Sequence, residues 1–514
     1  MGPLCFGVRV QRDRYIDSVA LLTITRTMQL AGAEFATAVM ATPANLAALA
    51  KEGFAGGELE EASPNDLLLA VRADSEATVD EALERGRQAL APTPSVDAAS
   101  ARRQVRSLSA ALDVLPDANV AIVSVPGPYA ALEAYKALAA GLHVLLFSDN
   151  VDVETEVALK EHAARAGRLV MGPGAGTASL GSCGLGFANA VSPGRVGVVA
   201  AAGTGAQEVM VLLDRWGEGV SHVIGVGGRD LSDPVAGRAA IQAVQALDRD
   251  PTTDVIVLVS KPPSPSVARA VVAAGGATPI VAALIGVARQ ATVPGAAAVS
   301  STLEAGVALA VRRRRRRPPS DWSEWRSRVA DSLHDLASER RAVRGLYSGG
   351  TLCSEALTLL EAWLGDVWSN TPLDQRYRVP APPAAHVCLD LGTEEYTKGR
   401  PHPMIDAAAR LELLAEAGRD DAVAVVLLDV VLGYGGHDDP ASVLAPACAA
   451  VTRPEGPRVV VYVLGTEKDP QGLDRQRRAF EEAGCLVAPS AARAALAAAA
   501  ISRRRPEFVE AELW

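Results

Sequence analysis

The sequence predicts an α/β fold of three domains, in which one Rossmann-like domain is followed by two flavodoxin-like domains with parallel sheets. Three observations favour it. The chain has 514 residues, enough for about three cores at roughly 150 residues per domain. Its residues are 49% apolar and 4% aromatic, which is typical of short Val-rich strands covered by Ala-rich helices. The pattern G-T-x-x-x-E-x-x-x-L-L occurs twice, beginning at Gly203 and at Gly350.

Residues 1–190 are expected to form the Rossmann-like domain. The segment "NVAIVSVPGPYAALEAYKALAAG" (119–141) has the pattern of a buried strand, a turn with Pro, and a helix that ends at a Gly. The segment "HVLLFSDNVDVETEVALKEHAARAG" (143–167) repeats that order, and "RLVMGPGAGT" (168–177) begins another strand. Strands separated by helices in this way predict a parallel sheet.

Two further blocks, at 194–311 and 341–505, are expected to be the flavodoxin-like domains. The first contains the strand-like runs "RVGVVAAAGTG", "HVIGVGGRD", "DVIVLVSKPP" and "PIVAALIG", and the second contains "HVCLDLG", "AVAVVLLDVVLGYGG" and "RVVVYVLGTEKD". Residues 312–340 are expected to be a linker, because they begin with six arginines (Arg312–Arg317) and two prolines. We interpret the arginine run as a solvated segment.

The charge and the cysteines exclude several functional classes. The formal net charge of −10 argues against a general nucleic-acid binder. The six cysteines have no metal-like spacing, so no metal site is predicted. No signal peptide and no run long enough to span a bilayer are recognisable, so we expect a cytoplasmic protein without a membrane partner.

The repeated glycine pattern predicts an anion site. In each copy it lies where a strand gives way to a helix, and a helix start offers unpaired N–H groups and the positive end of a dipole. The expected phosphate-binding residues are Gly203, Thr204, Gly205, Gly349, Gly350 and Thr351. If the two domains pack together, both helix starts can converge on one small anion. Thr204 and Gln207 also fit a capping box, and Glu208 and Glu355 are expected to orient the loops rather than react.

Other candidate residues follow strand-like runs. Lys261 follows a buried strand and is expected to contact the substrate anion, although it fits a solvated loop lysine as well. In "GRPHPMID", Arg400 is suited to bidentate recognition of an acid group, and His402 is a candidate general acid or base. Gly228, Arg229 and Asp230 correspond to Asp390 at matching strand ends, where an internal salt bridge is nearly as plausible an interpretation.

Several longer motifs together resemble the FdrA family over nearly the whole chain. These include "DSVALLTITRTM", "SPNDLLLAVR", "LPDANVAIVSVPGPYA", "FSDNVDVETEVALK", "GVGGRDLSDPV", "LYSGGTLCSEA", "LDLGTEEYTKGRPHPMID", "LLDVVLGYG" and "GTEKDPQ". FdrA proteins resemble a fusion of the succinyl-CoA synthetase α subunit with the carboxyl domain of its β subunit. This resemblance implies a CoA-binding-type first domain and two CoA-ligase-type domains.

The resemblance also implies a function. FdrA relatives are associated with oxamate carbamoyltransferase, which implies phosphate or carbamoyl phosphate as a substrate and companion protein subunits. No ATP-grasp domain is recognisable, and "ALIGVARQATVPGAAAVSS" lacks the histidine that the synthetase phosphorylates. No cofactor is therefore predicted with certainty. CoA stays a candidate ligand, and the formation of a homodimer stays open.

One loop departs from the family pattern M-G-P-D-C-G-T. Here Gly174 and Ala175 replace the Asp and the Cys, while Gly172, Pro173, Gly176 and Thr177 of this candidate ligand loop remain. The sequence thus predicts a carbamoyl-transferring subunit. It leaves two alternatives, an acyl-CoA synthetase subunit that needs an ATP-grasp partner and a catalytically silent assembly subunit.

Overall fold

The computed structural model describes residues 4–14, 16, 18–90, 105, 107–288, 290–397 and 401–513. The chain separates into two compact units. The first comprises Met1–Val105 with Thr397–Pro401, and the second comprises Arg106–Tyr396 with His402–Trp514. Among the described residues, no helix is both long and apolar enough to cross a membrane.

The first unit is built on an antiparallel sheet. Its elements are β1 (Cys5–Gln11), α1 (Ser18–Gln29), β2 (Phe35–Met40), α2 (Pro43–Lys51), β3 (Leu67–Ala73) and α3 (Glu76–Ala89), and the strand order is β1-β3-β2. The central strand β3 is almost fully buried and pairs antiparallel with both neighbours. Residues 1–190 are therefore not one Rossmann-like domain, because the elements from β1 to α3 form their own sheet around their own core.

The Rossmann-like part is confined to residues 107–171. It contains α4 (Leu108–Val114), β4 (Val120–Val123), α5 (Gly127–Ala139), β5 (His143–Leu146), α6 (Val153–Arg165) and β6 (Val170–Met171). The three strands are parallel in the order β4-β5-β6, as their alternation with helices predicts. The Asp152 side chain caps the start of α6 by accepting the N–H of Thr155 at 2.7 Å.

The next sheet has seven strands in the order β13-β12-β11-β9-β10-β7-β8. The strands are β7 (Thr177–Leu180), β8 (Cys183–Gly186), β9 (Pro193–Ala200), β10 (Val220–Gly225), β11 (Val255–Ser260), β12 (Ile280–Leu284) and β13 (Ala298–Ser300). The helices are α7 (Gly203–Arg215), α8 (Arg238–Arg249), α9 (Pro265–Ala273) and α10 (Leu303–Arg313). The hairpin β7–β8, which the sequence placed in the first domain, extends this sheet antiparallel to β10.

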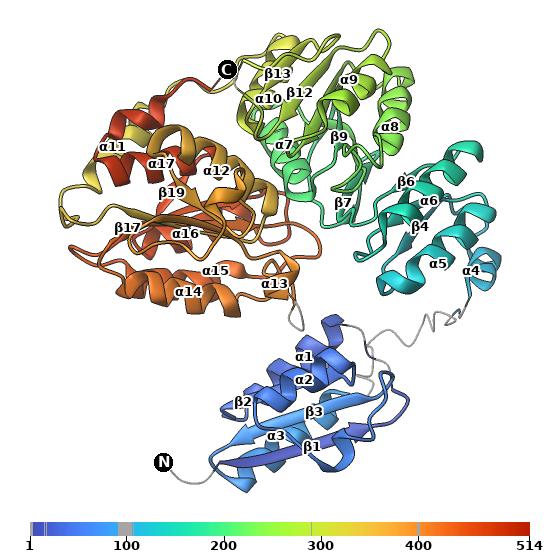
Figure 1. Cartoon of the computed structure of the whole chain (residues 1–514), viewed down its shortest axis with the longest axis vertical. Coiled ribbons are helices and arrows are strands. Elements are labelled where there is room, and N and C mark those ends of the chain that lie inside the picture. Colours follow the sequence, from blue (N-terminus) through green and yellow to red (C-terminus); the bar gives the residue numbers. More distant parts are fainter. Residues whose placement is uncertain are drawn as a thin grey trace. The chain divides into compact units, whose positions relative to one another are not determined.

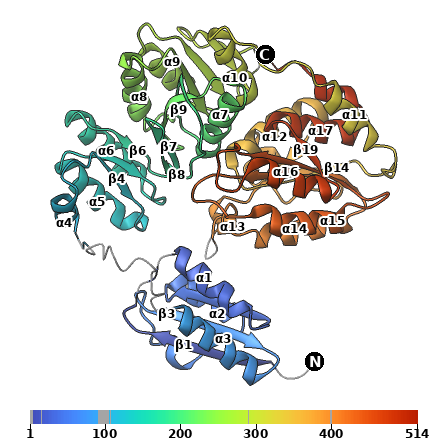
Figure 2. The same ribbon diagram turned by 180° about the vertical axis from the view of Figure 1, so that it is seen from behind.

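The last sheet has six parallel strands in the order β15-β16-β14-β17-β18-β19. The strands are β14 (Ala342–Tyr347), β15 (Val367–Trp368), β16 (His386–Asp390), β17 (Val423–Val431), β18 (Arg458–Leu464) and β19 (Leu486–Ala488). The helices are α12 (Gly350–Leu364), α13 (Glu394–Thr397), α14 (Ala408–Arg419), α15 (Pro440–Val451), α16 (Leu473–Glu482) and α17 (Ala491–Arg503). Figures 1 and 2 show this part from opposite sides.

The five parallel strands of the seven-stranded sheet and the last five of the six-stranded sheet have the same order. When the five strands of each set are numbered by their order in the chain, both sets are arranged in the sheet as 2-1-3-4-5. This is the flavodoxin-like arrangement. The prediction of two flavodoxin-like domains is thus confirmed. A single hydrophobic core extends from Val196 through α7 and α10 into α12 and α17, so the two domains are packed together.

The segment between the two domains is more ordered than a linker. The arginine run begins inside α10, and Arg314 and Arg316 both form ion pairs with the buried carboxylate of Glu218. Further on, α11 (Ser323–Asp331) places Trp325 and Val329 in the shared core. Arg313 also donates to the Ala297 carbonyl oxygen at 2.8 Å, so these arginines bind within the seven-stranded domain instead of being only solvated.

Candidate functional site

The two repeated glycine patterns begin α7 and α12, and the two helix starts meet. The backbone N–H of Thr351 donates to the Thr204 Oγ1 at 3.3 Å. A Cβ on Gly205 would lie 2.9 Å from the Thr351 Cγ2, so only glycine permits this approach. In each helix the N-cap residue, Ala202 or Gly349, forms no side-chain cap. The convergence that the repeat predicts is therefore present, and the Thr204 hydroxyl of one helix start caps the Thr351 N–H of the other.

The expected capping box at the start of α7 is wrong. The N-cap residue is Ala202, and the Gln207 side chain instead donates to Asn189 Oδ1 at 3.1 Å. Gln207 is buried, so its amide is satisfied by a neighbouring loop rather than by the helix start.

Lys261 lies at the carboxyl end of β11 and faces the start of α12. Its Nζ and the Asp390 Oδ2 lie 3.1 Å and 2.4 Å from the position that a Cβ on Gly350 would take. Lys261 is half-buried, and among the described residues its ammonium group has no hydrogen bond or ion pair. A cation held in this way beside a helix start is suited to an anionic ligand.

Asp390 ends β16 and is fixed on several sides. Its backbone exchanges two hydrogen bonds with the Asn370 side chain, at 2.9 and 2.8 Å, and its Oδ1 accepts the N–H of Gly392 at 3.0 Å. Burial raises the pKa of Asp390, and the nearby ammonium group of Lys261 opposes that rise. Asp390 and Lys261 therefore lie together in one polar centre beside the start of α12.

His402 reaches this centre from the other side. Its Nε2, the Ser348 carbonyl oxygen and the Asp390 Oδ1 lie 2.8, 3.1 and 3.2 Å from the position of a Cβ on Gly392. The Met404 N–H donates to the His402 Nδ1 at 3.3 Å, which places the proton of the neutral ring on Nε2. Burial lowers the pKa of His402, so its neutral form is favoured at neutral pH.

Asp429 is a site residue that sequence reasoning missed. It lies within β17, and its carboxylate accepts the N–H and hydroxyl of Ser348, at 2.7 and 3.0 Å, and the N–H of Gly349 at 2.7 Å. These bonds hold the turn from which α12 begins. A lone acidic residue in the apolar run "VAVVLLDVV" was the available signal, because a buried carboxylate requires partners.

The loop 172–177 does not form a backbone anion cradle. The N–H groups of Gly174 and Ala175 donate to the carbonyl oxygens of Ser148 and Leu146, at 3.0 and 3.3 Å. Gly174 has φ of +66°, a conformation that favours glycine over the Asp of the family pattern. Among the residues predicted for this loop, Thr177 approaches α7. The others are Gly172, Pro173, Gly174 and Gly176. The Thr177 Oγ1 lies 3.7 Å from the position of a Cβ on Gly203.

Arg229 and Asp230 have structural roles and lie outside the centre. The Lys160 Nζ donates to Asp230 Oδ1 and to Glu156 Oε1, both at 2.7 Å, and all three side chains are buried. Asp230 also accepts two N–H groups at the start of α8, and Arg229 pairs with Glu156. The internal salt bridge, which the sequence left as an alternative, is the observed arrangement. Gly228 precedes this cluster and has open space where a Cβ would be.

The repeated glutamates link the two flavodoxin-like domains. The Glu208 Oε1 of α7 accepts the N–H of Ala491, the first residue of α17, at 3.3 Å. The Glu355 Oε1 of α12 accepts the N–H of Leu303, the first residue of α10, at 2.6 Å. Each glutamate therefore caps the last helix of the other domain, which explains why the pattern contains a glutamate at this position.

Two further expectations concern Arg400 and a metal site. Arg400 lies outside the described residues, so its predicted ligand contact stays a prediction. Among the described residues no group of three or more His, Cys, Asp or Glu side chains is arranged to hold a metal ion.

Three family models match the chain. "CoA-ligase" matches residues 346–501, "CoA binding domain" matches 191–285, and "AllF, heavy metal-associated domain" matches 6–106. The CoA-binding match thus falls on the seven-stranded domain rather than on residues 1–190, where the sequence placed it. Residues 6–106 contain no cysteine and no histidine, so this segment offers a metal neither a thiolate nor an imidazole ligand.

Known proteins resemble the chain over different lengths. The succinate–CoA ligase α subunit of Methanothermobacter thermautotrophicus is 30% identical over 148 residues, which are 28% of this chain and 49% of that subunit. The ATP citrate lyase structure from Methanothrix soehngenii is 16% identical, covers 42% of this chain and 44% of its own, and has a TM-score of 0.35, too low to support an argument.

The protein YahF of Escherichia coli K12 is 36% identical over 504 residues, covering 95% of this chain and 97% of its own length. Two proteins with this sequence identity over nearly their full lengths have the same domain organisation. The chain therefore belongs to the same family as YahF, a succinyl-CoA synthetase-like fusion that joins a CoA binding domain and a CoA-ligase domain in one polypeptide.

Proposed function

We propose that this chain is a subunit of a carbamoyl-transferring enzyme whose phosphate or carbamoyl phosphate binds between the starts of α7 and α12. The observation that carries the proposal is Lys261, a half-buried cation without a hydrogen bond or ion pair among the described residues. It faces two converging helix starts whose N-cap residues, Ala202 and Gly349, form no side-chain cap. Such an arrangement favours a multiply charged anion, since N–H groups, dipoles and the ammonium group all act in the same direction.

The reaction can be followed in the direction that consumes phosphate. An oxygen of hydrogen phosphate forms a bond to the carbamoyl carbon, and the bond from that carbon to the amide nitrogen breaks. The phosphate proton passes to the leaving nitrogen, which gives carbamoyl phosphate and a primary amide. Lys261 offsets the charge of the phosphate, and the helix starts of α7 and α12 orient it.

His402 supports this proposal as a hydrogen-bond donor. With its Nδ1 accepting the Met404 N–H, the neutral ring presents N–H at Nε2 toward the centre. A neutral imidazole in this tautomer stabilises the negative charge that develops on the carbamoyl oxygen. This role differs from the general acid or base that the sequence suggests, because proton donation from a neutral ring would leave an unfavourable anion.

A second candidate function is that of a CoA-dependent ligase subunit. The matches to a CoA binding domain and to a CoA-ligase domain favour it. Against it, residues 283–301 contain no histidine to phosphorylate.

Calorimetric titration of the full chain with phosphate, carbamoyl phosphate and CoA tests both functions. We expect phosphate and carbamoyl phosphate to bind, and we expect Lys261→Met to weaken both by about tenfold or more, the effect of losing one charge-assisted contact. The matched control is Lys136→Met, because Lys136 is exposed and pairs with Glu133 on α5, outside the centre.

Equal phosphate affinity in Lys261→Met and Lys136→Met would refute the anion site. CoA binding without phosphate binding would instead support the ligase candidate.

A further inference from the structure

The proposed anion site contains an acceptor among its donors. Lys261, the helix starts of α7 and α12 and the Nε2 of His402 present a positive charge or N–H groups. Asp390 presents a carboxylate instead, and its Oδ2 lies 2.4 Å from the position of a Cβ on Gly350, at the start of α12. A carboxylate at this place repels a bound phosphate. Its presence in the centre therefore requires a reason of its own.

Asp390 is 5% exposed, yet only part of its carboxylate is satisfied within the chain. The Oδ1 accepts the N–H of Gly392 at 3.0 Å. Among the described residues, the Oδ2 accepts no hydrogen bond, and Lys261 forms no ion pair with it. A buried carboxylate oxygen without a donor is costly, so we expect the ligand to bring a donor to the Oδ2.

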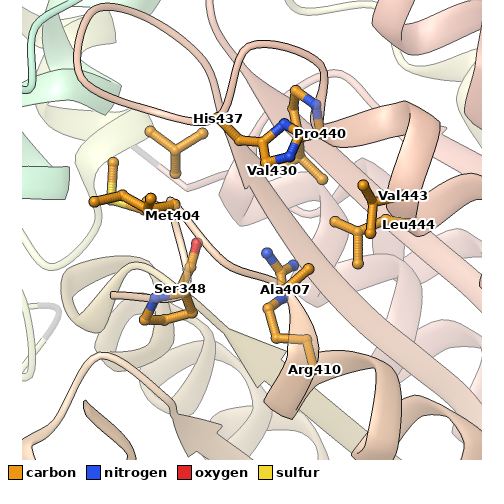
Figure 3. A pocket seen from close by; sticks show the side chains of 12 residues that line it. Ser348, Met404, Ala407, Arg410, Val430, His437, Pro440, Val443 and Leu444 are labelled. Atoms are coloured by element: carbon orange, nitrogen blue, oxygen red, sulfur yellow. The ribbon is translucent and has the colours of Figure 1, made fainter. Parts of the chain in front are cut away.

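Asp429, the other acidic residue of the centre, is satisfied by the protein itself. Its carboxylate accepts three hydrogen bonds from Ser348 and Gly349. The Nη2 of Arg410 also lies 3.5 Å from its Oδ1, and Figure 3 shows that Arg410 lines the same small cavity as Ser348. The charge of Asp429 is thus balanced inside the domain, whereas the Oδ2 of Asp390 is left for a ligand.

A ligand that satisfies all these groups combines an anionic group with an N–H donor. In carbamoyl phosphate, the phosphate and the amino group are both attached to the carbonyl carbon. Asp390 has Lys261 near its Oδ2 and His402 near its Oδ1. With the phosphate at Lys261 and the carbonyl oxygen at the Nε2 of His402, the amino group faces Asp390. An acetyl group would place a methyl group there, which cannot donate a hydrogen bond.

We propose that Asp390 determines the specificity of the site, by accepting an N–H of the carbamoyl group and so selecting it over simple acyl groups. A second acceptor lies close by, because the Ser348 carbonyl oxygen and the Asp390 Oδ1 lie 3.1 and 3.2 Å from the position of a Cβ on Gly392. The ionised carboxylate is the form that accepts, and the ammonium group of Lys261 favours that form. The inference rests on the proposed function, because it names the residue by which that site recognises its reactant.

A matched pair of stable probes tests this on the full chain by calorimetric titration. Phosphonoacetamide carries a phosphonate and an amide, and acetonylphosphonate has a methyl group in place of the amino group. We expect wild type to bind phosphonoacetamide about tenfold or more tightly than acetonylphosphonate, which is the effect of one hydrogen bond to a charged group.

The variant Asp390→Asn separates recognition from a structural role. The Gly392 N–H holds the amide oxygen at the position of Oδ1, so an NH2 group takes the place of Oδ2. We expect phosphonoacetamide to bind about tenfold or more weakly, because two donors then face each other. Inorganic phosphate should bind at least as tightly as to wild type, because the repulsion by the carboxylate is removed. The control is Asp117→Asn, which alters an exposed carboxylate between α4 and β4.

The outcomes distinguish the two proposals. Equal affinity of wild type for the two probes would overturn the role of Asp390, and so would parallel losses of phosphonoacetamide and phosphate affinity in Asp390→Asn. In either case, phosphate binding that depends on Lys261 would leave the proposed anion site in place. If neither phosphate nor phosphonoacetamide binds to wild type, the anion site is wrong and the role of Asp390 falls with it. If Asp390→Asn does not fold, the comparison of the two probes on wild type decides.

Discussion

At the scale of single residues, a missing methyl group at Gly350 leaves space for two charged side chains. A Cβ there would lie 2.4 Å from the Asp390 Oδ2, well inside contact distance, and 3.1 Å from the Lys261 Nζ. Gly203 occupies the same position of the other copy, yet a Cβ there would meet only the Thr177 Oγ1 at 3.7 Å. Two glycines that are equivalent in sequence therefore have different requirements.

This difference predicts opposite results for one substitution. Gly350→Ala should displace Asp390 and Lys261 and lower phosphate affinity by about tenfold or more, as expected when a charge-assisted contact is lost. Gly203→Ala adds a methyl group in ordinary van der Waals contact, so its phosphate affinity should stay within about threefold of wild type. Calorimetric titration of both variants checks this. Similar losses in the two variants would mean that Gly350 does not position the charged pair.

At the scale of elements, the starts of α7 and α12 are arranged by side chains from distant segments. Asp429 of β17 holds the turn before α12, and Glu208 and Glu355 each cap a helix of the opposite domain. Both glutamates are buried. Four helices, α7, α10, α12 and α17, are thereby linked by reciprocal caps, which fixes the angle at which the starts of α7 and α12 meet.

The buried glutamates make this interface sensitive to pH. Burial raises the pKa of Glu208 to about 7, while the hydroxyl of Tyr462, Arg215 and the Ala491 N–H oppose the rise and Glu304 adds to it. The folded state therefore binds a proton that the unfolded state releases above a pH of about 4.5. By linkage, the stability falls as the pH rises from about 4.5 to 7 and then levels off, by up to about 3 kcal/mol from this group.

The variant Glu208→Gln should remove this dependence. We expect its thermal midpoint to change less than that of wild type between pH 5 and pH 8, with a remaining slope from Glu355, whose pKa burial also raises. The control is Glu133→Gln, which alters an exposed carboxylate paired with Lys136. Thermal unfolding at several pH values measures the effect. A slope in Glu208→Gln as steep as that of wild type would contradict the assignment.

At the scale of the whole molecule, the two flavodoxin-like domains share one core. Residues of α7 and α10 and residues of α12 and α17 belong to the same buried cluster, which also contains Trp325 and Val329 of α11. The first unit, by contrast, has core residues of its own, such as Leu67 and Val71. The chain thus contains one separable unit and a pair of domains that stabilise each other.

The shared core predicts how the chain behaves when it is divided. Residues 1–320 and 321–514, produced as two chains in the same cells, should assemble into a stable complex, because the apolar faces of α7 with α10 and of α12 with α17 bury each other. Residues 321–514 produced alone should aggregate, since these faces are then exposed. Co-purification and size-exclusion chromatography distinguish the outcomes. A soluble monomer of residues 321–514 would show that the shared core is dispensable.

The sequence by itself determined the features that depend on local pattern. The alternation of strand-like and helix-like runs predicted both flavodoxin-like domains, because hydrophobic periodicity reports the local burial of each segment. The repeated G-T-x-x-x-E pattern predicted that two helix starts converge, and Lys261 was recognised because it follows a buried strand. Asp390 was proposed because it ends a strand-like run, and His402 because it lies in a loop with prolines that follows the same run.

Only the tertiary structure decided the features that depend on which distant segments pair. The sheet of β1, β2 and β3 is antiparallel. Hydrophobic periodicity could not predict this, because it does not report the direction of a neighbouring strand. Asp230 and Arg229 had a plausible site position, but their partners Lys160 and Glu156 lie about 70 residues away in sequence, and those partners make the pair structural. Asp429 accepts the N–H groups of Ser348 and Gly349 because β14 and β17, which are distant in sequence, pair in the folded chain. A buried charge is given its role by the groups that surround it, and only folding brings those groups together.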